Sequence, residues 1–429
     1  MERLKHNIIV ISTPIELSGG GSLRAFRSIK AYCKKFNTYL FIPHDGYKHF
    51  AQIKNNTLEI NELIMEGVRI FGYSKLKNFI YKFDYIPKIR VFTRIMPLAI
   101  PKGFILFKFA AEKIQKPEVV ISLHECLDSL YAAALLSKTF NCKSLALLQL
   151  PPFYGSKKRI SNILEAYKLW CNVLLENKTK AYAAFFFKKF LDNIHTNNAM
   201  KLLNKFSRII AVSKSISYEM GPEWISKIIA LDPGVSLDEE DEHMINLIRN
   251  EKHVKKDYVI FGGRPGDAFK GLIEALIVFK TISKENPNLK LICTGDIGKI
   301  VLDRINKFCH KLKINDKVVF TGFKERFERF KLVAESKLML YPSHVDSFSY
   351  AVLESLCLGT PVVGYKIPAL ETYYNGLQGV KLVEEGDIEA LAIEALNTLK
   401  EKCEVEKPQI RKWEDIINEE IKHIEELLC

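Results

Sequence analysis

The sequence has 429 residues, a length that indicates two or three domains and enough material for a large core. It is 48% hydrophobic and 26% charged, with apolar residues spread along the whole chain, which excludes a disordered protein. The net charge of +13 is concentrated, because residues 75–116 carry +8 and residues 157–206 carry +7, and this pattern indicates an anionic surface or acceptor as a partner.

Cysteine spacing and hydropathy narrow the class of protein further. The nine cysteines stand far apart, without a CxxC pair or a Cys/His cluster. A disulfide framework and a zinc site are therefore both disfavoured, and we expect a reducing, cytoplasmic compartment. No stretch reaches the roughly 18 uncharged apolar residues that cross a bilayer. The apolar run that follows the basic tip at 1–12 is interpreted as a first strand, not as a signal peptide.

Strand and helix signals alternate along the first half of the chain. Short apolar runs rich in β-branched residues predict strands, and helical periods lie between several of them. The predicted strands are 7–12, 38–43, 67–73, 118–123, 143–150 and 207–213, with helices at 22–35 and 125–138.

The alternation is more regular in the second half. The predicted strands are 257–263, 289–295, 317–323, 337–343 and 360–365, with helices at 271–285, 299–312, 324–336 and 350–358. Such alternation is typical of doubly wound parallel sheets. One sheet in each half predicts an α/β protein with two Rossmann-like domains that face each other across a cleft.

A domain boundary is predicted near residues 231–244, where a strand ends at Pro-Gly and a run of acids typical of a surface linker follows. We therefore assign residues 1–235 to a first domain and 236–407 to a second. Residues 408–429 form a final helix, whose single apolar stripe must pack against another element, such as the first domain. Ligands of such domains bind at the carboxyl ends of the strands, so the loops there are the candidate sites.

Two glycine-rich loops follow predicted strands. In the first, Gly19, Gly20 and Gly21 precede Ser22, which can cap the next helix, and backbone amides there can approach an anion. A flexible turn is the alternative, because neither dinucleotide nor P-loop spacing is present. In the second loop, Gly263 is followed by Arg264 and then by Lys270. Two fixed cations suit a diphosphate, although ordinary surface residues of a loop would look the same.

Two carboxylates lie near the end of the second domain. Asp346 follows a strand and Glu354 lies on the next helix, within the apolar segment AVLESLCLG. They could be an acid/base pair, metal ligands together with His344, or ordinary helix residues. A carboxylate in Glu354's apolar setting needs a hydrogen-bonding partner, and ribose hydroxyls would serve. His124 follows a strand of the first domain, where it is either a structural or a ligand-facing residue.

Taken in order, these motifs resemble the retaining, nucleotide-sugar-dependent glycosyltransferases with the GT-B fold, in the group 1 (family 4) set that also resembles glycogen synthase. The matching residues are Pro342, Ser343, Asp346, Phe348, Glu354, Gly359, Thr360, Pro361 and Val362, together with Gly263, Arg264, Lys270 and Gly271. The resemblance covers the second half nearly end to end and is weaker in the first. The sequence departs from the family in having Asp346 in place of a glutamate, and Ser347 and Ser349 in place of two glycines.

The resemblance implies a role for each matching residue. Arg264 and Lys270 would neutralise the donor diphosphate without a metal ion or another cofactor, and Asp346 would bind a donor-sugar hydroxyl. Glu354 would accept hydrogen bonds from the ribose. The other positions implied to meet the donor are Gly20, Gly21, Gly263, Phe348, Ser349 and Tyr350, with His124 near the sugar. The implied reaction moves a hexosyl unit from a nucleotide-diphospho-sugar to an acceptor hydroxyl with retention.

The basic segments bear on the acceptor. Segment 176–194 places four phenylalanines among lysines, and with 90–113 it could form amphipathic helices on an anionic membrane face. A lipid-linked or other glycan acceptor at the cytosolic leaflet would fit, with the first domain binding the acceptor and the second the nucleotide sugar. A core-packed helix with outward lysines is the alternative for the segment. Rival functions are a GT-B nucleotide-sugar epimerase and a basic nucleic-acid-binding protein, the latter being disfavoured because no recognised binding motif is present.

Overall fold

The computed structural model describes residues 5–12, 20–42, 58–72, 114–251, 254–401 and 403–429. The chain divides into two compact units. Unit 1 comprises Met1–Tyr154, Phe190–Val235 and Trp413–Cys429, and unit 2 comprises Gly155–Lys189 and Ser236–Lys412. Residues 155–189, which the sequence interpretation assigned to the first domain, therefore associate with the second unit.

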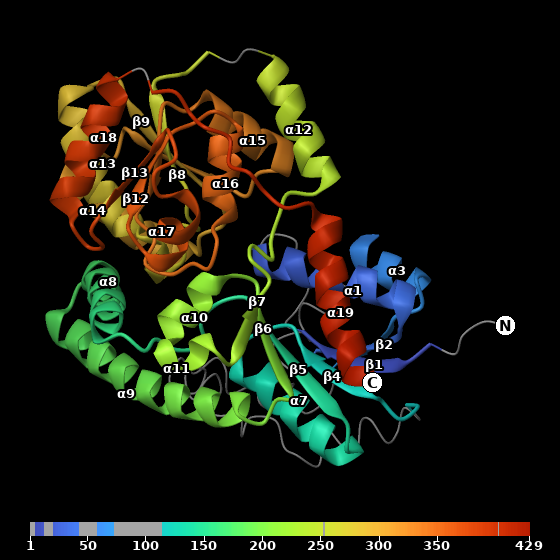
Figure 1. The fold of residues 1–429 in the computed structure, drawn as a ribbon. Helices are drawn as coiled ribbons and strands as arrows, with labels where there is room; N and C mark the ends of the chain where they lie inside the picture. The colour runs from blue at the N-terminus through green and yellow to red at the C-terminus, as the bar shows by residue number, and fades with distance from the viewer. Residues whose placement is uncertain (1–4, 13–19, 43–57, 73–113, 252–253, 402) are drawn as a thin grey trace. The chain divides into compact units, whose positions relative to one another are not determined.

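Unit 1 is built on a parallel sheet with the strand order β3-β2-β1-β4-β5-β6-β7 (Figure 1). Its elements are β1 (Asn7–Ile11), α1 (Gly20–Lys35), β2 (Asn37–Ile42), α3 (Leu58–Met65), β3 (Arg69–Gly72), β4 (Val119–Ser122), α7 (Leu127–Phe140), β5 (Lys143–Leu148), β6 (Arg208–Ala211), α10 (Lys214–Met220), α11 (Pro222–Ile225), β7 (Ile228–Ala230) and α19 (Trp413–Leu428). Chain order reverses between β1 and β4, so the sheet is doubly wound.

The strands of unit 1 are continuous apolar runs because helices cover both faces of the sheet. In β1 the alternating residues Ile9 and Ile11 pack with Val120 of β4 against the alanines and leucines of α7. Helices α1 and α19 lie side by side on the opposite face (Figure 1). Every residue of β1 after Asn7 is buried, so a one-residue change of register would alter the packing on both faces.

Helix α19 packs within unit 1 through the apolar stripe that the sequence predicted. Ile416 and Ile424 are fully buried, and burying each such side chain stabilises the fold by about 2 kcal/mol. Glu420 lies in the same stripe and is also fully buried. Its carboxylate accepts from the guanidinium of Arg24 and the hydroxyl of Tyr32, both on α1. A buried charged pair therefore joins the end of the chain to the first helix of the unit.

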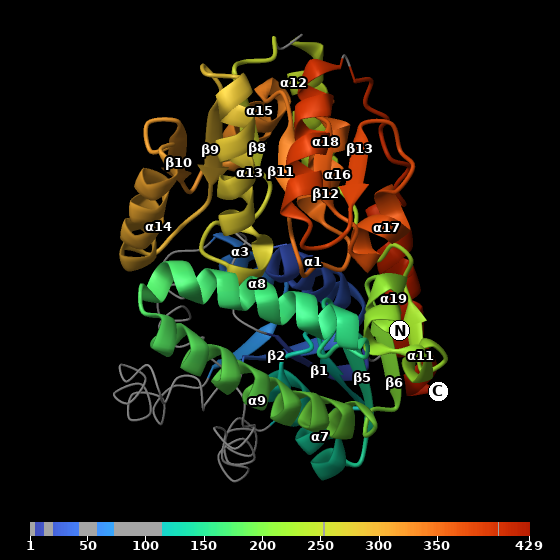
Figure 2. The ribbon, with the colours of Figure 1, turned by 90° about the vertical axis from the view of Figure 1, so that its left-hand side faces the viewer.

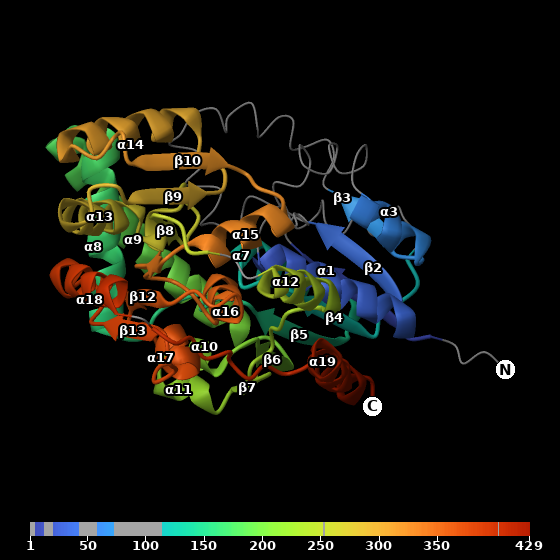
Figure 3. The same cartoon turned by 90° about the horizontal axis from the view of Figure 1, so that it is seen from above.

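Unit 2 contains a second parallel sheet, with the order β10-β9-β8-β11-β12-β13. Its elements are α8 (Lys157–Leu175), α12 (Glu239–Asn250), β8 (Tyr258–Phe261), η2 (Ala268–Lys270), α13 (Leu272–Glu285), β9 (Lys290–Thr294), α14 (Lys299–Leu312), β10 (Val318–Gly322), α15 (Arg326–Glu335), β11 (Met339–Tyr341), α16 (Tyr350–Cys357), β12 (Val362–Tyr365), α17 (Pro368–Tyr374), β13 (Val380–Val383) and α18 (Ile388–Lys400). Helices α13, α14 and α18 cover one face and α12, α15 and α16 the other (Figures 2 and 3). Two doubly wound parallel sheets confirm the predicted α/β class.

The acidic run after residue 237, interpreted from sequence as a linker, begins a helix. Asp238 caps α12 by accepting from the backbone N–H of Asp241 at 2.8 Å. Four acids, Glu239 to Glu242, occupy the first turn, where the helix dipole favours negative charge. Capping and dipole together make this sequence a helix start, which composition alone did not distinguish from a linker.

Helix α8 and the helix that follows it, α9 (Lys178–Leu203), explain why residues 155–189 belong to unit 2. Helix α8 packs on α14 and η2, and its Tyr167 ring stacks on Phe269 with centroids 6.1 Å apart. The ammonium of Lys188 on α9 lies 5.4 Å from the Phe269 ring, within cation–π range. Figure 2 shows α8 and the first part of α9 running beside each other as a hairpin. The two contacts of Phe269 join residues more than 75 positions apart in sequence, so the sequence pattern did not reveal them.

Candidate functional site

The candidate site of unit 2 lies where its chain order reverses, between β8 and β11. Ligands of open parallel sheets bind at the carboxyl ends of the strands at this point. The loop after β8 approaches its neighbours too closely for side chains: a Cβ on Gly263 would lie 2.7 Å from Phe261 Cζ. A Cβ on Gly271, which has φ +77°, would lie 1.9 Å from the carbonyl oxygen of Pro342. Glycine is therefore required where the β8 loop meets the β11 loop.

Lys270 and Asp346 join these two loops. Lys270 Nζ lies 3.0 Å from Asp346 Oδ2 and donates to the carbonyl of Val345 at 2.7 Å. Burial alone would disfavour the charged ammonium, but the carboxylate outweighs it and raises the pKa of Lys270. Burial would likewise raise the pKa of Asp346, and the Lys270 charge reverses the effect and lowers it. Both groups are thus held in their charged forms.

The Asp346 carboxylate also organises its own loop. Oδ1 accepts from the backbone N–H groups of Ser347 and Ser349 at 2.9 and 3.1 Å. Oδ2 accepts from Lys270 and from the hydroxyl of Tyr341. Four donors match the capacity of an ionised carboxylate, so a donor-sugar hydroxyl at Asp346 would share acceptor atoms already in use. Aspartate is common in turns because its short side chain can bond to nearby backbone amides, and a glutamate would carry the carboxylate one methylene farther from them.

Helix α16 begins directly after the Asp346 loop. Ser349 has φ +69° and ψ +90°, a conformation that favours glycine, yet its hydroxyl caps the helix by accepting from the N–H of Val352. Phe348 is buried, with its ring centroid 4.9 Å from Tyr373 and 6.5 Å from Tyr350. The predicted donor-binding residues Phe348, Ser349 and Tyr350 therefore form one continuous turn that the Phe348 ring anchors in the core.

Glu354 lies on α16 and is buried, as its apolar sequence context predicted. Its hydrogen-bonding partner in the structure is Arg329 of α15, which donates through both terminal nitrogens, one of them at 2.8 Å. Burial would lower the pKa of Arg329, but the Glu354 carboxylate raises it. The ribose role predicted for Glu354 would thus involve a carboxylate that a guanidinium already orients.

Arg264 is the exposed cation of the site. Its side chain is 67% exposed and pairs with Asp267 at 3.1 Å. Asp267 also accepts from the backbone N–H of Phe269 and so caps the short helix η2 that ends at Lys270. Arg264 and Lys270 therefore lie on one short loop, Arg264 with an exposed guanidinium and Lys270 held by an internal carboxylate.

In unit 1, the chain order reverses between β1 and β4, and the predicted residues gather there. His124 Nε2 lies 3.2 Å from the hydroxyl of Ser12, and Nδ1 lies 3.4 Å from the amide nitrogen of Gln149. Burial, and then the charge of Arg24, lower the pKa of His124 to about 3. An amide nitrogen only donates, so Nδ1 accepts and the neutral ring carries its proton on Nε2.

Gly21 lies at the same edge, in the first turn of α1 that begins at Gly20. A Cβ on Gly21 would lie 3.0 Å from Gln149 Oε1, so the glycine allows the amide to approach the helix start. Gly19 and the basic segment 90–113 lie outside the described residues. The structure thus brings Gly21 and His124 together in unit 1, and Lys270 and Asp346 together in unit 2.

Sequence reasoning missed several residues of both edges. Tyr341 is the last residue of β11 and Gln149 follows the end of β5. Both stand at the carboxyl ends of strands, so the rule that selected His124 would also have selected them. Arg329 gave no such signal, because it lies in the middle of a helix and meets Glu354 only through the packing of α15 on α16.

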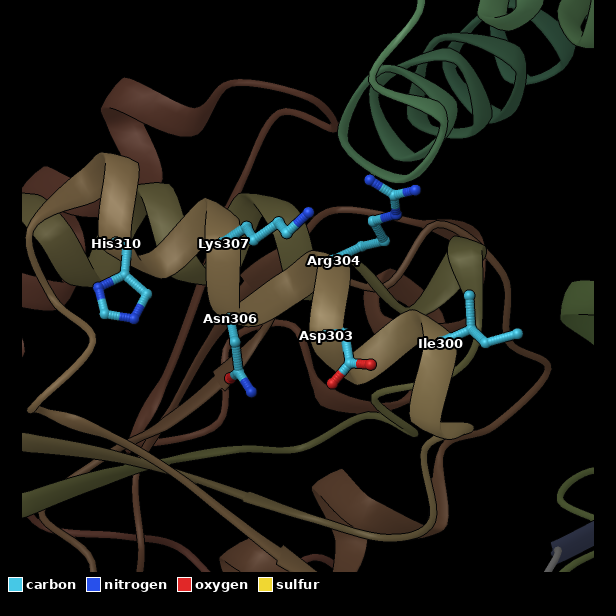
Figure 4. A pocket seen from close by; sticks show the side chains of 6 residues that line it. All are labelled: Ile300, Asp303, Arg304, Asn306, Lys307 and His310. Carbon is cyan, nitrogen blue, oxygen red and sulfur yellow. The ribbon is translucent and has the colours of Figure 1, made fainter.

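A separate hollow of about 510 Å³ lies along α14. Figure 4 shows its lining residues Ile300, Asp303, Arg304, Asn306, Lys307 and His310. Arg304 points away from Asp303 toward α8, where it pairs with Glu176. The hollow shares no residue with the edge between β8 and β11. Across the residues that the structure describes, no group of three or more His, Cys, Asp or Glu side chains is placed to hold a metal ion.

The fold is that of known GT-B glycosyltransferases. Anabaena HepE, solved in complex with UDP and glucose, matches with a TM-score of 0.62 and 15% identity, over 98% of this chain and 99% of that one. Sucrose-phosphate synthase of Thermosynechococcus elongatus matches with a TM-score of 0.61 and 12% identity, over 98% and 99%. At these identities the likeness concerns the fold alone.

The family match lies almost entirely in the second unit. Residues 245–413 match the family described as Glycosyl transferases group 1. An uncharacterized glycosyltransferase of Methanocaldococcus jannaschii is 29% identical over 188 residues, 40% of this chain and 46% of the relative. The alpha-monoglucosyldiacylglycerol synthase of Streptococcus pneumoniae is 30% identical over 137 residues, 30% of this chain and 29% of the relative. The chain thus spans less than half the length of these curated relatives.

Proposed function

We propose that the protein is a retaining glycosyltransferase that moves a hexosyl unit from a nucleotide-diphospho-sugar to an acceptor hydroxyl. The observation that carries the proposal is the Lys270–Asp346 pair at the reversal point of the unit 2 sheet, inside the segment that matches the family. The complexes of HepE with UDP and with UDP-glucose support a nucleotide-sugar donor.

The proposed chemistry needs cations at the departing diphosphate. The acceptor oxygen attacks the anomeric carbon on the same face as the departing phosphate. Its bond to that carbon forms as the bond between the carbon and the phosphate oxygen breaks, and the hydroxyl proton leaves with the nucleotide diphosphate. Lys270, held charged by Asp346, and Arg264 on the same loop offset the charge that develops there. We propose that these residues do so without a metal ion or another cofactor, and that catalysis is mainly positioning and charge stabilisation.

The two units supply different contacts in this proposal. Unit 2 binds the donor, with Glu354 meeting the ribose and the turn from Phe348 to Tyr350 meeting the sugar or phosphate. Unit 1 supplies His124, whose ring is neutral at physiological pH. A neutral imidazole with its proton on Nε2 is suited to hydrogen bonding with an uncharged sugar hydroxyl.

We further propose a lipid-linked acceptor at the cytosolic face of a membrane. On α9, Tyr182 and Phe186 are 58% and 52% exposed. Lys178, Lys180 and Lys189 are exposed around them. Exposed aromatic rings among lysines are typical of helices that lie on anionic membranes. The Streptococcus relative, named for a glucosylated diacylglycerol, supports this choice. None of the helices that the structure describes is long and apolar enough to cross a membrane.

The proposal is tested by titrating the protein with UDP-, GDP- and ADP-sugars and following release of the nucleotide diphosphate, with and without EDTA. We expect one nucleotide class to bind, with turnover that survives EDTA and requires an acceptor such as diacylglycerol. Product with the anomeric configuration of the donor supports retention. Absence of any nucleotide-sugar binding contradicts the proposal. An altered sugar released without acceptor indicates an epimerase, and tight salt-sensitive binding of nucleic acid indicates the rival class.

A further inference from the structure

His344 is buried between two carboxylates, only two residues before Asp346. Its Nε2 lies 3.0 Å from Glu274 of α13, and its Nδ1 lies 2.8 Å from Glu385, which follows β13. The side chain is 3% exposed. Neither carboxylate belongs to a motif that the sequence singled out, and the reaction proposed above uses none of the three residues.

The charge state of the ring follows from its partners. An ionised carboxylate only accepts hydrogen bonds, so two carboxylates that face both ring nitrogens require a proton on each. Burial alone would lower the pKa of His344, but the bonds to Glu274 and Glu385 outweigh it and raise the pKa. For Glu385, burial is outweighed by His344 and Arg159, and its pKa is lowered.

The other elements packed against the His344 ring supply further polar, charged and aromatic groups. Arg159 of α8 pairs with Glu385, and Asn162 of α8 donates to Glu385 at 2.6 Å. Tyr365 of β12 supplies a neutral ring, with its centroid 5.1 Å from the imidazole. We name Arg159, Glu274, His344 and Glu385 the His344 cluster; its two cations and two anions compensate one another in the core.

The cluster is connected to the donor loops through the main chain of His344. The His344 N–H donates to the carbonyl of Phe269 at 2.9 Å, next to Lys270. Its carbonyl accepts from Arg159 at 2.7 Å. The same residue therefore fixes the β8 loop that carries Lys270, the β11 loop that carries Asp346, and helix α8.

We propose that His344 is a positioning residue that acts as an imidazolium, holding the Lys270 and Asp346 loops in the arrangement that binds the donor diphosphate. Loss of its proton leaves one ring nitrogen facing a carboxylate with no hydrogen between them, and the two loops separate from α8 and α13. The expected effect on donor binding rests on the proposed function. The expected loosening of the two loops does not.

The sign of the pH dependence follows from linkage. The pKa of His344 is higher in the folded than in the unfolded protein, so its contribution is fully present below the unfolded value of about 6.5. The stabilisation by His344 is lost as the pH rises through the pKa of this residue in the folded protein. Donor binding and protection of the loops should therefore fall on the alkaline side and not on the acid side.

The experiment combines hydrogen–deuterium exchange, corrected for intrinsic pH effects, with donor KM from about pH 6 to pH 9.5, a range that brackets histidine titration. We expect peptides covering 264–271 and 342–349 to lose protection as pH rises. In Glu274→Gln this loss and the rise in donor KM should move about one to two pH units lower, the effect of losing one hydrogen bond to a charged group. His310→Gln, at an exposed histidine of α14, serves as the matched control and should not move either curve.

The outcomes separate this inference from the proposed function. Loops that loosen with pH in a protein that binds no nucleotide sugar would support the His344 cluster and contradict the transferase. If donor KM rises at alkaline pH but Glu274→Gln does not shift the pH of that rise, the positioning role is overturned. This holds even if the variant unfolds at a lower temperature. A ¹⁵N-histidine spectrum, assigned with His344→Gln, gives a direct readout: a neutral His344 ring at pH 7 in the wild type overturns the inference without any activity measurement.

Discussion

Lys270 and Asp346 form a largely buried ion pair that joins the loops after β8 and β11, with Nζ and Oδ2 3.0 Å apart. The two residues are 76 positions apart in sequence. Their side chains meet because parallel strands of neighbouring position present their carboxyl ends at one edge of the sheet. The pair holds a charged ammonium at the point where such sheets bind ligands.

Replacing Asp346 should destabilise the protein. Asp346→Asn leaves the Lys270 ammonium without its counter-charge, and breaking a buried pair in this way costs about 3 kcal/mol of unfolding free energy. Because the pKa of Asp346 is lowered in the fold, the difference from wild type should be complete above about pH 4 and shrink only at lower pH. Urea denaturation measures it. Asp257→Asn breaks an exposed pair with Lys337 and should change the unfolding free energy little. Equal losses of unfolding free energy in both variants would contradict the role given to the Lys270–Asp346 pair.

Arg264→Ala should slow turnover while leaving the fold intact. The side chain is mostly exposed and pairs with the nearby Asp267, so the unfolding free energy should stay within about 0.5 kcal/mol of wild type. Loss of one cation at the departing diphosphate should lower kcat by about 10²-fold. Steady-state kinetics and thermal unfolding check both points, with Lys337→Ala as the control. Unchanged kcat would remove Arg264 from the site.

Glu354 and Arg329 allow a structural role to be separated from a donor-binding role. Glu354→Gln and Arg329→Gln both break the same charged pair, so both should lower the unfolding free energy, by about 1–3 kcal/mol. Only Glu354→Gln also removes the carboxylate proposed to accept from the ribose, so its donor KM should rise about tenfold more. Steady-state kinetics with varied donor concentration compare the two. The same KM for both variants would show that Glu354 acts only through Arg329.

Ser349→Gly should stabilise the protein. At φ +69° a non-glycine residue is strained by about 1 kcal/mol, whereas replacing a serine cap by glycine costs only a few tenths of a kcal/mol. The expected net gain is about 0.5 kcal/mol, measured as a rise in Tm. A lower Tm would indicate that the Ser349 hydroxyl contributes more than its bond to Val352.

The exposed face of α9 should bind anionic membranes. Substituting Tyr182 and Phe186 by serine removes two exposed rings, and vesicle binding should fall at least about tenfold. Sedimentation with phosphatidylglycerol and phosphatidylcholine vesicles measures this, and attraction by the neighbouring lysines predicts a preference for the former that salt weakens. Ile300→Ser, at an exposed side chain of α14, is the control. Equal binding of variant and wild type would place the membrane contact elsewhere.

The regular alternation of apolar runs predicted the parallel sheets, because strands buried on both faces must be apolar throughout. Ile8 to Ile11 of β1 and Val362 to Tyr365 of β12 are examples in which every residue is buried. The site loops could be found for a related reason: glycines such as Gly271 are required by close backbone contacts, and such contacts occur at fixed positions after strands.

Side-chain partners could not be predicted in the same way. The sequence indicated that Glu354 needed a hydrogen-bonding partner and suggested ribose, but it gave no sign of the Arg329 guanidinium that contacts the carboxylate in the fold. Asp346 was noted as a departure from the family, but its bonds to Ser347 and Ser349 depend on a loop geometry that appears only in the fold. The grouping of residues 155–189 with unit 2 depends on ring contacts such as Tyr167 with Phe269, which leave no periodic pattern.

The proposed function requires the loops carrying Lys270 and Asp346 to bind the donor diphosphate. Hydrogen–deuterium exchange with and without saturating UDP, with GDP and ADP in parallel, tests it most directly. We expect one nucleotide to protect the backbone amides of 263–271 and 342–354. Protection confined to 299–312, along the hollow of α14, or no protection by any of the three, would contradict it.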